Sequence, residues 1–281
     1  MGGVAGPELA GAVAAAGALG MLCEFDVEPS TERMTQALAL AGDGAVGMGF
    51  FGHWVQSDLA TFEEAAARLR LVEVFWTEPD PELIARARRA GTALVAWQVG
   101  SVESALAAVD AGCDLVIAQG VEAGGHVRGT TPRDELLAAV LDRVDVPVVA
   151  AGGIATAQQV ADVMAAGAAA ARVGTRFVAT TESRGHSAYK KALVDARSGE
   201  DTVLTEAFGD GWPDAPHRVL RSALEAAERS GAAPPYPVST PSRHVEGEIA
   251  AMALYAGTGV GDVRMITPAS DVIAELVADL G

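Results

Sequence analysis

The feature that most constrains the fold is a repeated junction, in which a helical stretch ends at Ala-Gly and an apolar strand follows within one to three residues. The glycines of these junctions are Gly17, Gly42, Gly91, Gly112 and Gly167. A glycine just past a helix end adopts the left-handed capping conformation without a Cβ penalty. Their spacings are 25, 49, 21 and 55 residues, and each long interval contains a further transition, near Arg70 and near Asp145. Seven junctions therefore recur about every 25 residues.

This pattern predicts seven strands, each followed by a helix. The strands are Leu19–Cys23, Ala45–Phe50, Leu71–Phe75, Ala93–Trp97, Leu115–Ala118, Val146–Ala151 and Ala170–Gly174. Strands and helices that alternate at this spacing indicate a parallel α/β sheet. Seven such units nearly complete a TIM-type (β/α)8 barrel, and the chain starts where the first strand of that barrel is expected. We therefore expect an α/β barrel of this type that lacks its first strand, with an open doubly wound sheet as the alternative.

The regular period stops after residues 181–183, which predicts a change of architecture. Residues 200–250 contain a strand-like run, a Pro-rich loop, one helix and a long loop. The tail "PASDVIAELVADL" has helical apolar spacing after an Asp/Ser start. We expect a barrel over 1–199, a small C-terminal lobe over the barrel mouth at 200–250, and a loop with a closing helix at 251–281.

Composition excludes some classes of function. The formal net charge is −17, which argues against nucleic-acid and membrane partners because phosphates would be repelled. Cys23 and Cys113 are the only cysteines and stand far apart, so we expect a reducing, cytoplasmic location. No His/Cys/Asp cluster has the spacing of metal ligands, and we expect no metal. The oligomeric state is left open, a homo-oligomer included.

Two glycine-rich turns follow the last two predicted strands, where barrels commonly bind phosphate. Gly152 and Gly153 leave backbone N–H groups bare before a helix that starts near Thr156. Gly174 and Thr175 provide further N–H groups and a hydroxyl after the next strand. Side by side, the two turns suit a dianion. Tight turns without a ligand are the alternative.

The stretch "AQGVEAGGHVRG", residues 118–129, follows the strand beside those two. Its glycines, Gly120, Gly124 and Gly125, let a planar ligand lie against the backbone, and Gln119 offers an amide to a heterocyclic ring edge. His126 then projects above that ring, and an imidazole with a pKa of about 6.5 can take up a proton at neutral pH. A histidine that only caps the loop is the alternative. Gln98, at the end of another strand, faces the same mouth.

The remaining polar residues have more ordinary interpretations. We expect Glu122 to accept hydrogen bonds from loop N–H groups, and Arg128 either to attract an anionic substrate or to form a surface salt bridge. His186 and His217 stand at apparent helix starts and are interpreted as structural. His53 is a weaker candidate on the substrate side.

The stretches "AQGVEAGGHVRG", "VPVVAAGGIA" and "VGTRFVATTES" resemble the nitronate monooxygenase family of FMN-dependent barrel enzymes. The resemblance covers nearly the whole chain. It implies that Gln119 and Gly124 contact the flavin, and that His126 is the catalytic base. It also implies that Gly153 and the run Arg172, Val173, Gly174 and Thr175 hold the phosphate of the flavin. At the position of Gly49, many members of that family have an asparagine that contacts the flavin.

The resemblance implies that FMN oxidises alkyl nitronates, and nitroalkanes after loss of a proton, with dioxygen as the second substrate and a carbonyl compound and nitrite as products. Flavin-type enoyl-ACP reductases share the "EAGGH" loop and the phosphate loops. An NAD(P)H-dependent reductase of that kind and a non-catalytic flavin-binding protein are the alternatives.

Overall fold

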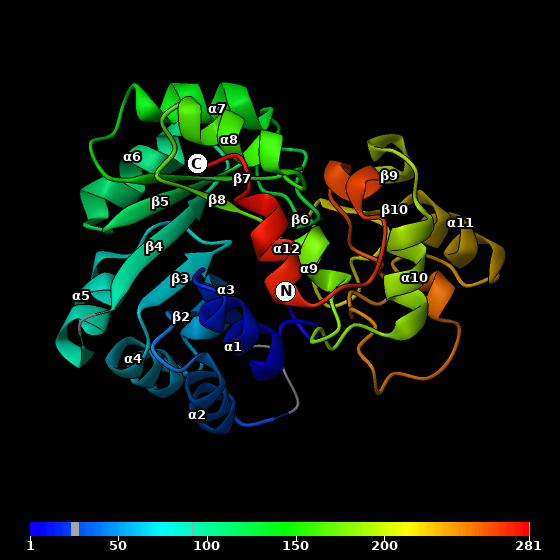
Figure 1. Cartoon of the computed structure of the whole chain (residues 1–281), viewed down its shortest axis with the longest axis horizontal. Coiled ribbons are helices and arrows are strands. Elements are labelled where there is room, and N and C mark those ends of the chain that lie inside the picture. Colours follow the sequence, from blue (N-terminus) through cyan, green and yellow to red (C-terminus); the bar gives the residue numbers. More distant parts are fainter. Residues whose placement is uncertain (24–27, 92, 281) are drawn as a thin grey trace.

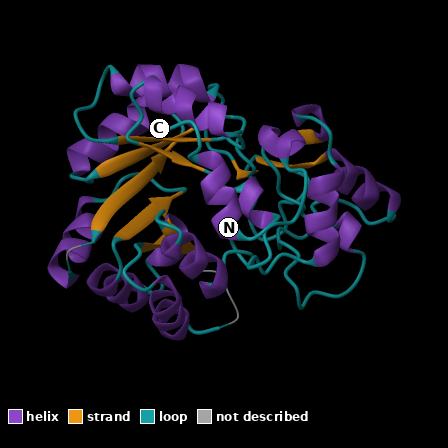
Figure 2. Ribbon diagram, viewed as in Figure 1, coloured by secondary structure: helices purple, strands orange, loops and turns teal. Residues whose placement is uncertain are grey.

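The computed structural model describes residues 1–23, 28–91 and 93–280, without the side chain of His53. Seven parallel strands form one curved sheet in the order β1-β2-β3-β4-β5-β7-β8, with helices against its outer side (Figures 1 and 2). The strands are β1 (Gly20–Cys23), β2 (Val46–Phe51), β3 (Leu71–Phe75), β4 (Leu94–Val99), β5 (Leu115–Gln119), β7 (Val148–Ala151) and β8 (Ala170–Arg172). Within the described residues nothing pairs β1 with β8, so the sheet is an open, barrel-like half-cylinder. The predicted α/β barrel class is confirmed.

The helices follow the strands as the period predicts. They are α1 (Pro7–Ala15), α2 (Ser30–Ala41), α3 (Gly52–Val55), α4 (Leu59–Arg68), α5 (Pro81–Ala90), α6 (Val102–Ala111), α7 (Arg133–Leu141), α8 (Ala157–Ala165), α9 (Thr175–Val178), α10 (Ser187–Asp195), α11 (Arg221–Arg229) and α12 (Ala269–Leu276). Side chains cap several of them; Ser101, for example, accepts from the N–H of Ser104 at the start of α6. No helix in the described part of the chain is long and apolar enough to cross a membrane.

The junction glycines serve two different purposes. Four of the five have the expected positive φ, and Gly112 caps α6 in the left-handed region with φ 98°. Gly91 is the exception, because its φ is −172°. A Cβ at Gly91 would lie 2.3 Å from the carbonyl oxygen of Ala66, so glycine here permits the close approach of α4 to the end of α5. The expectation of a left-handed cap at this residue was wrong.

The alternation of side chains along the strands positions the site. Val72 and Val74 point outward into the main core beneath the helices. Leu71 points inward, where it joins a small apolar cluster with Ala96, Leu115, Ile117 and Ala151. Because side chains alternate with a period of two, the next inward residues toward the carboxyl ends are Glu73, Gln98, Gln119 and Arg172. The interior of the sheet therefore changes from apolar to polar at its carboxyl end.

A small lobe lies beside the sheet, to the right in Figure 1. Its three-stranded antiparallel sheet has the order β6 (Gly125–His126), β10 (His217–Leu220) and β9 (Thr202–Thr205). Three short 3-10 helices cover Gly199–Asp201, Ile249–Ala251 and Thr258–Asp262. A second hydrophobic cluster joins residues from α10, β10, α11 and the later loops. The division at residues 199 and 250 remains a prediction.

The tail forms the predicted closing helix. Val272 and Leu276 of α12 are buried in the main core, and the helix packs against α1, α8 and α9. Val277 and Leu280 follow the last residue of α12 and are exposed.

A cluster of ion pairs links α1, near the start of the chain, to Arg184 and Arg243 beside the pocket described below. Arg184 is 5% exposed and donates from Nε to Glu8 Oε2 at 2.8 Å and from Nη2 to Glu8 Oε1 at 3.2 Å. It also contacts Glu28, while Arg243 contacts Glu8 at 3.3 Å. Burial alone would raise the pKa of the Glu8 carboxyl, but the hydrogen bond and charge of Arg184, with the charge of Arg243, outweigh it and lower that pKa.

We expect Glu8→Gln to destabilise the protein by about 1 kcal/mol at pH 7 and by progressively less in acid. A carboxyl whose pKa is lowered by folding stabilises the native state above its unfolded pKa, and this contribution disappears as the pH falls through the folded pKa. Urea unfolding of both proteins between pH 7 and pH 3 measures the difference. Glu135→Gln, on an exposed residue of α7, is the control. A difference that does not change with pH would contradict the assignment.

Candidate active site

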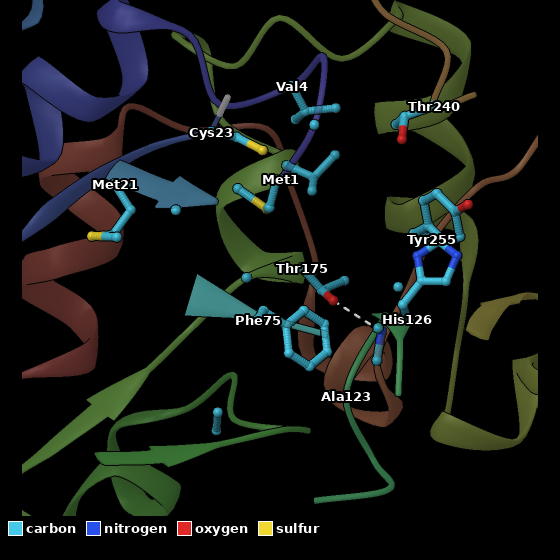
Figure 3. A pocket seen from close by; sticks show the side chains of 18 of the residues that line it. Met1, Val4, Met21, Cys23, Phe75, Ala123, His126, Thr175, Thr240 and Tyr255 are labelled. Carbon is cyan, nitrogen blue, oxygen red and sulfur yellow. Dashed lines mark hydrogen bonds between the residues drawn. The ribbon is translucent and has the colours of Figure 1, made fainter. Parts of the chain in front are cut away.

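A cavity of about 570 Å³ opens at the carboxyl ends of the strands (Figure 3). Ten of the sequence-predicted site residues line it: Gln98, Gln119, Gly124, Gly125, His126, Gly152, Gly153, Arg172, Gly174 and Thr175. Val173 does not, since its side chain packs against the main core. The turns expected to bind phosphate and the histidine expected to act as base therefore share one pocket.

The two glycine turns lie next to each other because β7 and β8 are paired, with Ala151 opposite Arg172. Gly152 and Gly153 have φ of 113° and 69°, conformations that only glycine adopts readily. Thr156 caps α8 at its predicted start, and the Gln159 side chain takes the N–H groups of Ala155 and Thr156. Residues 152–154 and 174–175 line the cavity, so their backbone N–H groups are the candidates for holding an anion.

Gln119 is 6% exposed and holds the loop that carries the histidine. Its Nε2 donates to the carbonyl oxygen of His126 at 3.0 Å, which fixes the orientation of the amide. Its Oε1 is buried without a hydrogen-bond partner in the protein. Buried acceptors are almost always satisfied, so Oε1 is suited to an N–H or O–H of a bound ligand. One N–H of the amide is therefore used within the protein, while Oε1 is an acceptor that a ligand could satisfy.

His126 lies on β6, at the seam between the barrel and the lobe. Its ring stacks on that of Trp212, with centroids 3.9 Å apart and an interplanar angle of 22°. Its centroid is 5.8 Å from that of Trp76 and 5.6 Å from that of Tyr255. Figure 3 shows His126 and Tyr255 together on one side of the cavity. These ring contacts orient the imidazole in the cavity wall.

The tyrosines of the pocket are poor proton donors or acceptors. The hydroxyl of Tyr255 donates to the carbonyl of Val238 at 2.8 Å, and that of Tyr189 donates to the carbonyl of Tyr255. Burial raises the pKa of both hydroxyls. Among the described residues of the cavity wall, His126 is therefore the side chain best suited to carry a proton at neutral pH.

The inward polar residues form a buried group at the base of the cavity. Arg172 Nη1 donates to Gln98 Oε1 at 2.9 Å and contacts Glu73 Oε1. The guanidinium of Arg172 thus reaches into the sheet interior, toward β3 and β4. Glu73 had no role in the sequence analysis, although a lone carboxylate in the apolar run "LVEVF" is a signal that could have revealed it.

Glu122 and Arg128 have structural partners. Glu122 Oε2 accepts from the N–H of Arg133, the first residue of α7, at 2.9 Å, in the kind of role expected for it. Arg128 donates to the carbonyl of Thr77 at 2.7 Å and pairs with Glu78, so its side chain holds the loop after β3 rather than the pocket.

The other histidines have different settings. His186 caps α10, as expected, and its Nδ1 accepts from the N–H of Ala188 at 3.1 Å. His217 lies on β10 and not at a helix start, because the chain pairs there with β9 and β6. Its Nε2 accepts from the Phe208 N–H and its Nδ1 donates to the Ala215 carbonyl, so it is neutral and structural, with its pKa lowered by burial. The His53 side chain lies outside the described residues.

The chain matches the family described as nitronate monooxygenase over residues 64–279, which is more than half of its length. It belongs to the nitronate monooxygenase family. This family consists of flavin-dependent oxidoreductases, which supports the prediction of an enzyme of this class, and the chain spans somewhat less than two thirds of the length of the curated relatives that it matches. The family match gives no role to any individual residue of the pocket.

Several relatives extend the comparison. The chain is 36% identical over 241 residues to the (3aS,4S,5R,7aS)-5-hydroxy-7a-methyl-1-oxo-octahydro-1H-indene-4-carboxyl-CoA dehydrogenase of Rhodococcus jostii, which covers 82% of this chain and 64% of that protein. The structure of nitroalkane oxidase from Streptomyces ansochromogenes is 33% identical, with a TM-score of 0.80, and the match covers 100% of this chain and 93% of that one. FabK from Thermotoga maritima is 28% identical with a TM-score of 0.78, covering 99% and 90%.

Proposed function

We propose that this protein is an FMN-dependent nitronate monooxygenase that converts alkyl nitronates, and nitroalkanes more slowly, to carbonyl compounds and nitrite with dioxygen. The observation that carries the proposal is the single cavity shared by the two glycine turns, the buried acceptor of Gln119 and His126. The likeness to the Streptomyces nitroalkane oxidase supports the choice of substrate class. The cytoplasmic location stays a prediction.

The residues fit the group they would hold. Backbone N–H groups at 152–154 and 174–175 suit the phosphate, and the buried Oε1 of Gln119 suits the N–H of an isoalloxazine ring. When bound, FMN supplies the electron-accepting and oxygen-reacting chemistry. His126 removes the α-proton of a neutral nitroalkane, whereas a nitronate has already lost it. Phe51, Trp54 and Trp212 pack edge to face over the mouth and keep the reacting carbon away from water.

A second function has its own support. The likeness to FabK and to the Rhodococcus carboxyl-CoA dehydrogenase favours a flavin oxidoreductase that acts on a thioester, with an NAD(P)H-dependent reductase as the form to test. The two functions require different reductants for the flavin. A non-catalytic flavin-binding protein would use neither.

The absorbance spectrum of the purified protein separates these functions. We expect a bound-flavin spectrum that is unchanged after anaerobic addition of NADPH or NADH and is bleached by an alkyl nitronate. Rapid bleaching by NADPH would favour the reductase and contradict the monooxygenase. Bound flavin that neither reagent reduces would show a non-catalytic protein.

A further inference from the structure

The base of the cavity contains an ion pair, with a buried carboxylate and a partly exposed guanidinium, that the proposed reaction does not use. The Glu73 side chain is 3% exposed and pairs with Arg172, whose side chain is 33% exposed. Gln98 Oε1 accepts from the same guanidinium nitrogen. A carboxylate at this depth is stable only when a cation and hydrogen bonds compensate it.

The second oxygen of Glu73 is not compensated by the protein. Glu73 Oε2 is buried and has no hydrogen-bond partner. Gly49 of β2 has no side chain to pack on this oxygen, and a Cβ built there would lie 3.7 Å from Oε2, an ordinary contact distance. Glu73, Arg172, Gln98 and Gly49 all line the cavity. The Glu73–Arg172 pair therefore sets the charge that a ligand at this end of the pocket meets.

The charge of this pair matters for a redox ligand. A lone cation in a low-dielectric pocket would strongly favour the electron-rich, anionic form of a bound flavin, because unit charges a few ångströms apart interact strongly there. Glu73 contacts Arg172 directly, so the pair presents little net charge. Without the carboxylate, the guanidinium would act on the ligand alone.

We propose that Glu73 is a positioning residue that neutralises Arg172 at the base of the cavity and so would lower the reduction potential of a flavin bound there and its affinity for anions. This inference rests on the proposed binding of flavin in this pocket. Glu73 acts through Arg172 and touches no reacting atom.

Sulfite titration of the FMN-loaded protein tests the proposal without turnover. Sulfite adds to N5 of oxidised flavin and leaves a negative charge on the ring, so its affinity reports the electrostatics of the site. We expect Glu73→Gln to lower the sulfite Kd at least about tenfold. The reduction potential of the bound flavin, measured with redox dyes, should rise. For a two-electron couple, a tenfold change in the equilibrium constant for reduction equals about 30 mV.

Two further variants make the result specific. Glu78→Gln removes a carboxylate from the loop that follows the same strand, in an ion pair outside the cavity, and should leave the sulfite Kd within about twofold. The double variant Glu73→Gln/Arg172→Gln removes both charges and should return the sulfite Kd to near the wild-type value. A structural role alone would not give this reversal.

The outcomes are distinguishable. Flavin fluorescence quenching first shows whether each protein binds FMN. A wild-type protein that binds no FMN would overturn both the proposed function and this inference. If Glu73→Gln binds FMN normally but its sulfite Kd and reduction potential are unchanged, the inference alone is overturned. It is also overturned if Glu78→Gln shifts the sulfite Kd as much as Glu73→Gln does.

Discussion

His126→Asn is expected to lower kcat/KM for a neutral nitroalkane by about 100- to 10,000-fold and to lower nitronate turnover by less than about tenfold. The neutral substrate needs a base to remove its α-proton, and His126 is the described pocket side chain best suited to that task. A nitronate arrives deprotonated and needs only orientation and the cofactor. Asparagine is similar in size and can keep much of the packing against Trp212.

The rates of nitrite release from a nitroalkane and from its own nitronate, at saturating dioxygen, measure the difference between the two losses. His244→Asn is the control because His244 is exposed and does not line the cavity. FMN binding should be unchanged in both variants. Equal losses on the two substrates would show that His126 holds or shields the substrate but does not remove its proton.

Gly153→Ala is expected to weaken FMN binding by about 10- to 100-fold, the equivalent of 1–3 kcal/mol of local strain. Gly153 has φ 69°, where an L side chain is strained. An added Cβ would also lie 2.8 Å from Thr258 Oγ1 and 2.9 Å from Glu122 Cβ. The turn must therefore shift, and the N–H groups proposed to hold the phosphate shift with it.

A matched variant separates this effect from general destabilisation. Gly231→Ala also places a side chain at positive φ, 80°, but in open space and away from the cavity. Fluorescence titration with FMN gives the two Kd values, and thermal melting of the apoproteins gives their stabilities. If Gly153→Ala folds and binds FMN as tightly as Gly231→Ala, the turn does not bind the phosphate.

The order of the strands and helices could be read from the sequence because it is encoded locally. Apolar runs, helix ends and capping residues such as Thr156 each depend on a few neighbouring residues, and the parallel sheet follows from their spacing. The same logic placed the two glycine turns and His126 at one end of the sheet, since the carboxyl ends of parallel strands meet at one edge. Gly91 shows the limit, because its purpose is a contact with Ala66 of another helix.

The tertiary structure alone decided how the rest of the cavity is built. Trp212 reaches His126 only because β10 of the lobe pairs with β6, and no local pattern marks that pairing. Glu73 and Arg172 are brought together across the interior of the curved sheet, and His217 became a strand residue through pairing on both sides. Periodicity shows which way a side chain points, but the curvature of the sheet and the docking of the lobe determine what it meets.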